Sequence, residues 1–179
     1  MTIEQLKSAY EAHYQKFATD IFFSPGRVNL IGEHTDYNGG FVFPCALSFG
    51  TYLLIAANNE NKINFCSLNI DVTYSLELDQ LTKPMPDKAW ANYPLGVLAQ
   101  FMKRGVVIEQ GYDLLFWGNV PAGAGLSSSA AMEVVTAYAL NELLGTGYNR
   151  TELAKIGQKA EHEYAGVMCG IMDQFASSH

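Results

Sequence analysis

Cysteine, basic side chains and long apolar runs are all scarce in this sequence. Its three cysteines, Cys45, Cys66 and Cys169, are odd in number and have no CxxC spacing, so a disulfide framework is not indicated. Each sits among apolar or small residues, as buried thiols usually do. We therefore expect three buried, reduced thiols and a cytoplasmic protein.

Basic residues are outnumbered, because eleven Lys and Arg face eighteen Asp and Glu, for a net charge of −7. A field of that sign repels polyanions, so nucleic acid is not an expected partner. The longest apolar runs, such as residues 52–57, fall far short of the roughly 20 residues that span a bilayer. The N-terminal Thr2-Ile-Glu-Gln5 is a helix capping box and lacks the apolar run of a signal peptide, so neither a membrane segment nor export is expected.

The length, hydrophobic content and element pattern of the chain fit a globular α+β domain. The chain has 179 residues, 49% of them hydrophobic, which is enough for a substantial core. Strand patterns dominate the first two thirds and helix patterns the remainder, which predicts a mixed sheet with helices packed on one face. The first strand should break at Pro25-Gly26. The expected strands are 20–24, 50–58, 62–67, 72–78 and 111–118, and the expected helices begin at Thr2 and cover 90–103, 128–144, 149–164 and 170–179.

A glycine- and serine-rich loop, residues 120–130, joins an expected strand to an expected helix with the sequence VPAGAGLSSSA. Glycines let a backbone approach a ligand closely, and the unpaired amides at a helix N-terminus attract phosphate oxygens. The Lys-Ser/Thr ending of a P-loop and the GxGxxG spacing of dinucleotide folds are both missing. The loop is either a phosphate cradle or an ordinary strand–helix connection with a serine N-cap.

Charged residues concentrate in a second segment, residues 24–40, where Arg27, Glu33, His34 and Asp36 lie between glycines. Carboxylates and imidazole accept and donate hydrogen bonds in different directions, as recognition of a polyhydroxylated sugar requires. A solvated loop with local Asx turns is the alternative.

A third segment, residues 169–175, places Asp173 and Gln174 among small and apolar residues. That setting can bury a carboxylate beside a cation, although Asp173 could equally be a helix N-cap. Glu161, on the preceding helix, is either a Mg²⁺ ligand or, as is commoner for helix carboxylates, solvated. His13 and His162 are expected on solvated helix faces.

Taken together and in this order, the three segments resemble the galactokinase branch of the GHMP kinase family over essentially the whole chain. The sequence GRVNLIGEHTDYNGG, residues 26–40, is similar to the galactokinase signature, whereas the PxxxGLSSSA loop is shared with mevalonate and homoserine kinases. The resemblance implies two lobes with the active site between them. Residues 1–179 would form the N-terminal lobe, a ribosomal-protein-S5-like α+β unit. Its expected partner is a C-terminal lobe of the same protein, which this sequence does not contain, since the last helix ends without a cap.

The resemblance also implies ATP and galactose as substrates, Mg²⁺ as cofactor, and roles for individual residues. Arg27 and Asp173 would be catalytic, with Asp173 acting either as a proton acceptor or as a positioning group. The sugar-binding residues would be Glu33, His34, Asp36 and Gly170. The nucleotide-binding residues would be Pro121, Gly123, Ala124, Gly125, Leu126, Ser127, Ser128, Ser129, Trp90 and Tyr93, and the metal ligands would be Ser129 and Glu161.

The implied activity is ATP-dependent phosphorylation of the anomeric hydroxyl of galactose, giving galactose 1-phosphate for catabolism. Three alternatives stay open. One is a galactose and ATP sensor without productive turnover, another is an N-acetylgalactosamine kinase, and the third is a purely structural fragment whose apolar face meets the C-terminal lobe.

Overall fold

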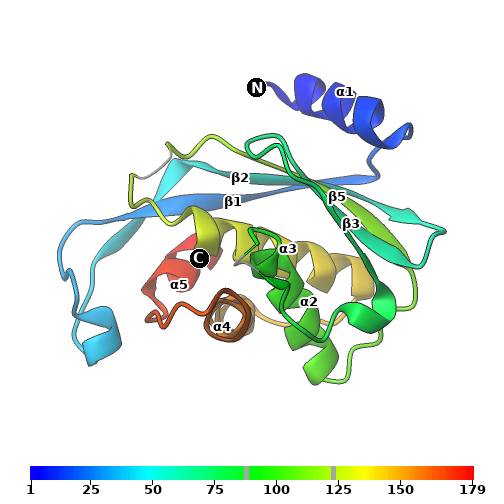
Figure 1. Ribbon diagram of the computed structural model, residues 1–179. Coiled ribbons are helices and arrows are strands. Elements are labelled where there is room, and N and C mark those ends of the chain that lie inside the picture. The colour runs from blue at the N-terminus through cyan, green and yellow to red at the C-terminus, as the bar shows by residue number, and fades with distance from the viewer. Residues whose placement is uncertain (87–88, 122–123) are drawn as a thin grey trace.

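The computed structural model describes residues 1–86, 89–121 and 124–179. A five-stranded mixed sheet carries helices α2–α5 on one face and α1 on the other (Figure 1). The α+β prediction is confirmed, except that α1 covers the opposite face. The helices are α1 (Ile3–Tyr14), α2 (Asn92–Lys103), α3 (Ser128–Leu144), α4 (Arg150–Ala160) and α5 (Met172–Ser178). The strands are β1 (Asp20–Asn29), β2 (Pro44–Asn58), β3 (Lys62–Ser67), β4 (Tyr74–Glu77) and β5 (Gly111–Gly118).

The order of strands in the sheet is β1-β2-β5-β3-β4. β2 and β3 follow each other in the chain, yet β5 lies between them, antiparallel to β2 and parallel to β3. Because β5 has a strand on each side and helices above and below, residues 111–116 are all buried. The carboxyl end of β5 leads directly into the glycine- and serine-rich loop and α3, so the centre of the sheet positions that loop.

The second half of β2 is apolar on both faces, because both faces are covered there. Leu53 and Ile55 pack into the large core beneath the sheet, whereas Leu54 and Ala56 contact α1 through side chains such as Tyr10. A strand covered on both sides reads as a continuous apolar run and loses the alternation of a half-exposed strand.

The predicted break at Pro25-Gly26 is wrong, because β1 continues to Asn29. β1 is an edge strand, where proline is tolerated, and the pairing with β2 shifts register between Pro25 and Arg27 as a β-bulge. Gly26 lies opposite the bulged residues 47–49 of β2, and a Cβ there would lie 2.6 Å from the carbonyl oxygen of Leu126. Glycine thus lets the loop before α3 lie against β1 directly before Arg27.

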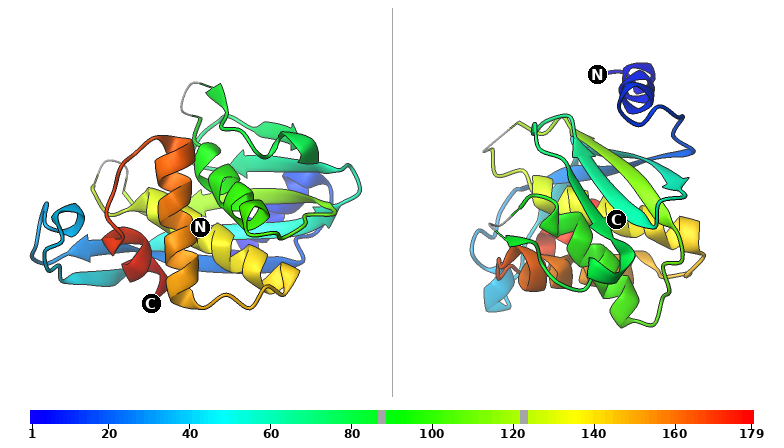
Figure 2. Two further views of the ribbon diagram at one scale, coloured as in Figure 1. Left: turned by 90° about the horizontal axis from the view of Figure 1, so that it is seen from below. Right: turned by 45° about the vertical axis from the view of Figure 1, so that its right-hand side comes forward.

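Three further elements differ from the predicted bounds. β2, expected over 50–58, begins at Pro44. The helix expected over 149–164 ends as an α-helix at Ala160 and continues as a π-helical turn, Glu161–Ala165, a feature that is frequent at functional sites. The strand expected over 72–78 is limited to β4. Between β1 and β2, residues 30–43 form an arm that projects beyond the helical layer and contains the short 3₁₀ turn Asp36–Asn38 (Figures 1 and 2).

The burial of the cysteines was only partly predicted. Cys66 is buried, Cys169 is half-buried and Cys45 is exposed, and all three are free thiols. Cys45 lies at the start of β2, where the β1–β2 pair extends toward the arm. His13 is exposed as expected, whereas His162 is half-buried and within 2.8 Å of the Cys169 carbonyl oxygen. None of the helices in the described residues combines the length and apolarity needed to cross a membrane.

Candidate active site

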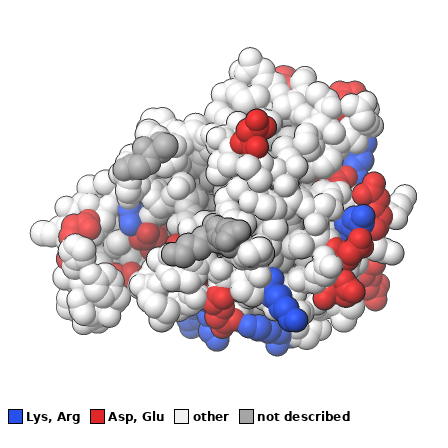
Figure 3. Space-filling model, viewed as in Figure 1, with Lys and Arg blue, Asp and Glu red and all other residues white. Residues whose placement is uncertain are grey.

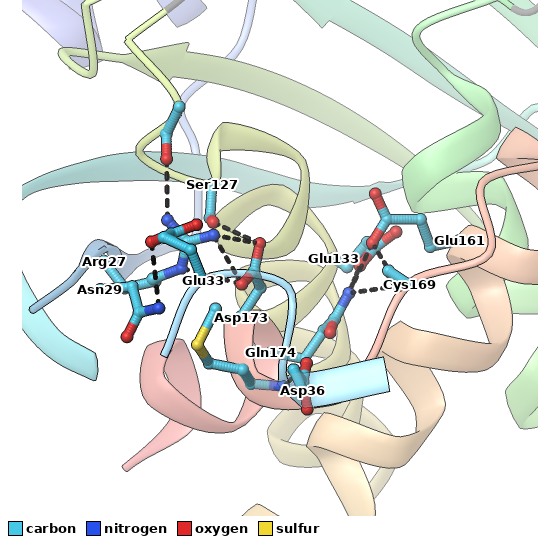
Figure 4. Close-up of polar contacts among 12 residues, drawn as sticks. Arg27, Asn29, Glu33, Asp36, Ser127, Glu133, Glu161, Cys169, Asp173 and Gln174 are labelled. Carbon is cyan, nitrogen blue, oxygen red and sulfur yellow. Dashed lines mark hydrogen bonds and ion pairs between the residues drawn. The ribbon is translucent and has the colours of Figure 1, made fainter. Parts of the chain in front are cut away.

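β1, just past its register shift with β2, and the first turn of α5 bring Arg27 and Asp173 together (Figure 4). Arg27 Nε donates to Asp173 Oδ1 and Nη2 donates to Oδ2, each at 2.8 Å. This bidentate geometry is the strong form of an arginine–carboxylate pair. Asp173 lies inside the first turn of α5, after Ile171 at the N-cap position, so it is not the N-cap. The Arg27 guanidinium therefore orients the Asp173 carboxylate, and the sequence around Asp173 had predicted a carboxylate beside a cation.

The loop before α3 is hydrogen-bonded to both Arg27 and Asp173. Arg27 Nη1 donates to the Gly125 carbonyl at 2.7 Å, and the Arg27 backbone amide donates to the Leu126 carbonyl at 3.2 Å. Ser127 occupies the N-cap position of α3 with φ +56°, yet its side chain caps nothing, because its hydroxyl donates to Asp173 Oδ2. The serine N-cap interpretation is therefore wrong. The first amides of α3 carry no side-chain cap and point toward the loop, where an anion is favoured.

Asp36 connects the arm to the start of α5. Its Oδ2 accepts a hydrogen bond from the Met172 amide at 2.9 Å. A Cβ on Gly170 would lie 1.9 Å from that oxygen, so only glycine leaves room for the carboxylate. Residues 36, 170 and 172 thus meet at one point.

Glu33 and His34 stand on the exposed part of the arm. Glu33 Oε1 accepts from Asn29 Nδ2 at 3.0 Å. His34 has φ +60°, and its Nδ1 is 2.6 Å from the Tyr37 hydroxyl. Both side chains are exposed to solvent, yet each has a partner that limits its direction.

Three adjoining cavities contain most of the predicted site residues. The signature cavity, about 230 Å³, is lined by Arg27, Glu33, His34, Asp36, Gly170 and Asp173, among others. The loop cavity, about 310 Å³, is lined by Arg27, Val120, Pro121, Ala124, Gly125, Leu126, Ser127, Ser128, Ser129 and Asp173. The aromatic cavity, about 410 Å³, includes Trp90, Tyr93, Ser128 and Ser129 in its lining. Gly123, also expected in the loop, lies outside the described residues.

The cavities share walls in a definite order. Arg27 and Asp173 line both the signature cavity and the loop cavity. Ser128 and Ser129 line both the loop cavity and the aromatic cavity. Figure 3 shows acidic and basic side chains meeting in a hollow beside the projecting arm. A ligand group in the first cavity and one in the second would therefore meet at Arg27 and Asp173.

A buried polar cluster lies behind the loop (Figure 4). The Gln174 amide donates to Glu133 Oε2 at 2.9 Å and to Glu161 Oε2 at 2.6 Å, and the Cys169 thiol lies 3.2 Å from Glu161 Oε2. Glu161 is only 6% exposed, so the solvated interpretation of this residue is wrong. It is not among the residues lining the three cavities. Sequence reasoning missed Glu133 and the role of Gln174, although a glutamate inside the apolar stretch AAMEVV was a usable signal.

Burial governs the protonation of this cluster. Burial first, and the neighbouring Glu161 second, raise the pKa of Glu133 well above its ordinary 4.5. Burial, followed by Glu161, also raises the pKa of the Cys169 thiol, which keeps it protonated and unreactive. The pKa of Tyr93 is raised by burial and then by Glu161 and Glu133. Tyr93 thus stands between the buried cluster and the aromatic cavity.

Two family models match the sequence. The model described as GHMP kinases N terminal domain matches residues 92–179, and the model described as galactokinase galactose-binding signature matches residues 8–57. Together they include β1, the arm, the glycine- and serine-rich loop and α5. The chain belongs to the GHMP kinases.

Individual relatives narrow the assignment. The chain is 52% identical over 178 residues to a galactokinase of Clostridium acetobutylicum, covering 98% of this chain and 44% of that protein. It is 46% identical to a galactokinase of Bacillus subtilis, covering 97% of this chain and 45% of that protein. The crystal structure of Lactococcus lactis galactokinase complexed with galactose superposes with a TM-score of 0.92 at 37% identity, covering 99% of this chain and 46% of that one. Within the family, the chain is the counterpart of the N-terminal part of galactokinases and spans about half their length.

Proposed function

We propose that the protein containing this chain is a galactokinase, which transfers the γ-phosphoryl group of ATP to the anomeric hydroxyl of galactose. The proposal rests on one observation: Arg27 and Asp173 line both the signature cavity and the loop cavity. One of the two cavities they line has carboxylates and an imidazole suited to sugar hydroxyls, and the other has a glycine-rich loop at a helix N-terminus suited to phosphates. The structure described as complexed with galactose, at 37% identity, supports the choice of sugar.

In this proposal Glu33, His34 and Asp36 bind sugar hydroxyls and bring one hydroxyl to Asp173. Asp173 accepts the hydrogen bond of that hydroxyl and then, as the bond to phosphorus forms, its proton. Because the transition state of phosphoryl transfer is loose, alignment and charge neutralisation contribute more than a strong base. Arg27 fixes the Asp173 carboxylate and provides positive charge next to the transferring group. A role in which Asp173 only positions the hydroxyl is the alternative within the same reaction.

The nucleotide would lie along the loop and aromatic cavities. The first amides of α3 and the loop backbone from Pro121 to Ser129 would contact the phosphates, and Trp90 and Tyr93 would flank the adenine. These cavities adjoin at Ser128 and Ser129, which is the order that base and phosphates require.

In this proposal Mg²⁺ would bind in the oxygen-rich region behind the loop. Ser129 and Glu133 are one helical turn apart on the same face of α3, and Glu133 is joined to Glu161 through Gln174. Glu133 Oε1 is a buried oxygen without a partner among the described residues. Hydroxyl and carboxylate oxygens are the ligands Mg²⁺ prefers, so Ser129 and Glu161 would hold the ion. When bound, Mg²⁺ neutralises phosphate charge during transfer. The three free thiols and the use of ATP support a cytoplasmic location.

The test is an ADP-release assay with ATP and Mg²⁺ on the full-length protein, using galactose, N-acetylgalactosamine or no sugar. Galactose-dependent turnover that exceeds turnover with N-acetylgalactosamine supports the proposal. Preference for N-acetylgalactosamine would reassign the substrate, and galactose binding without ADP release would indicate a sensor. The same assay on residues 1–179 tests whether the missing lobe is needed.

A further inference from the structure

One buried glutamine joins two acidic side chains from different elements. Gln174 has an exposure of 0%. Its amide nitrogen donates to Glu133 on α3 and to Glu161 on the π-helical turn, at 2.9 and 2.6 Å. A glutamine amide has two hydrogens to donate, so both are directed to carboxylates. Figure 4 shows the amide nitrogen pointing toward the two carboxylates.

The packing around Gln174 restricts its position. A Cβ on Gly157 of α4 would lie 3.1 Å from Gln174 Cγ and 3.3 Å from Glu133 Cβ, so this glycine makes the space in which the two side chains meet. Gln174 Oε1 and Glu133 Oε1 are buried and have no hydrogen-bond partner among the described residues. Unpaired buried oxygens cost stability. Two such oxygens in one cluster are unusual for groups that only stabilise a fold.

We propose that Gln174 is a positioning residue for Glu161. Its amide fixes the carboxylate that would hold Mg²⁺ together with Ser129, and Glu133 anchors the amide from the opposite side. This inference rests on the proposed kinase function. Gln174 follows Asp173 directly in α5, so one helix orients both the reacting carboxylate and the cation-binding carboxylate. Groups that orient a metal ligand typically change metal affinity by about 10- to 100-fold when they are removed.

The same π-helical turn offers a matched control. Gln100 is 2% exposed, and its amide donates to Glu163 Oε2 at 2.7 Å. Glu163 is exposed and forms an ion pair with Lys103 at the surface, away from the cluster of Gln174, Glu133 and Glu161. Gln100→Met and Gln174→Met each remove a hydrogen bond from a buried amide to a carboxylate, which is part-buried for Gln100 and buried for Gln174. Only the second bond lies next to the proposed cation site.

The experiment measures cation binding directly, with full-length protein, a non-hydrolysable ATP analogue and Mn²⁺ as a paramagnetic probe followed by EPR. Gln174→Met should weaken Mn²⁺ binding by about 10- to 100-fold and leave galactose binding, followed by calorimetry, within about twofold. Gln100→Met should leave both affinities near the wild-type values. A purely structural role of Gln174 predicts that both variants lose stability alike and that neither changes cation affinity.

A milder variant guards against misfolding. Gln174→Asn keeps the amide but shortens the side chain by one methylene, so it cannot reach both carboxylates, and Mn²⁺ binding should weaken here too. Cation affinity that is unchanged in either variant, once its fold is verified by circular dichroism, overturns the proposal. Because the readout is binding, it stays informative even if the ADP-release assay shows no galactose turnover, which would count against the proposed function alone.

Discussion

Replacing Gly170 with alanine tests whether the arm and α5 are packed as tightly as the structure indicates. The new Cβ would lie 1.9 Å from Asp36 Oδ2, whereas real Cβ contacts are essentially never under 3.0 Å. The carboxylate must therefore retreat by at least 3.0 − 1.9 = 1.1 Å. A shift of this size breaks the 2.9 Å bond from the Met172 amide to Asp36. Hydrogen bonds to charged groups contribute roughly 1.5–3 kcal/mol, which corresponds to about 10- to 100-fold in affinity.

We expect Gly170→Ala to weaken galactose binding by that factor and to change ATP-analogue binding by less than about twofold, since the loop cavity is not touched. Isothermal titration calorimetry on full-length protein measures both. The backbone of Gly170 has no positive φ, so the alanine itself is compatible with the chain conformation.

A double-mutant cycle isolates the cause. Asp36→Ala removes the atoms that the new Cβ would meet, so adding Gly170→Ala to Asp36→Ala should cost little further affinity. The reasoning is refuted if Gly170→Ala binds galactose as tightly as the wild type, or if it imposes the same penalty in both backgrounds.

Three further predictions concern single side chains of the full-length protein. Asp173→Asn should abolish turnover if Asp173 accepts the proton, and a loss of only a few-fold in kcat would restrict it to positioning. Ser127→Ala removes a hydrogen bond to the Asp173 carboxylate and should lower kcat by about tenfold with a smaller change in KM for galactose; an unchanged kcat would show that the contact is idle. Because the pKa of Glu133 is raised in the folded state, the stability from its protonated form is present below about pH 4.5 and is lost as the pH rises through the folded pKa. Glu133→Gln cannot ionise and should flatten that decline in urea unfolding with EDTA, whereas parallel pH profiles would contradict the assignment.

Local sequence rules predicted most of the elements, because capping residues and apolar periodicity act over a few neighbours. The capping box at Thr2 and Gln5 is present in the structure, as is the one at Asn149 and Glu152. The break at Pro25-Gly26 was mispredicted, since the bulge depends on pairing with β2 and on the loop that packs against Gly26. Neither interaction is local.

The site residues, too, were predicted where local sequence was enough and missed where distant contacts decide. Arg27 and Asp173 stood out by residue type, yet the spacing of residues in the sequence does not reveal that they form a pair. Ser127 looked like an N-cap because it precedes a helix, but its hydroxyl turns to Asp173, a partner 46 positions away. Glu161 looked solvated because helix carboxylates usually are, and only the packing of its π-helical turn against α2, α3 and α4 shows that it is buried.

The position of α5 also determines when the site can form as the chain is made. Its contacts to Asp36, to Arg27 and to Ser24 join residues separated by 136, 146 and 153 positions. At about 5–20 residues per second of ribosomal synthesis, Arg27 precedes Asp173 by roughly 7–30 s. Throughout that interval the sheet can begin to assemble. Arg27 and the Ser127 hydroxyl, however, still lack the Asp173 carboxylate as their partner. The reaction centre is therefore among the last parts of this lobe to be completed, and substitutions in α5 should slow its maturation more than that of the sheet.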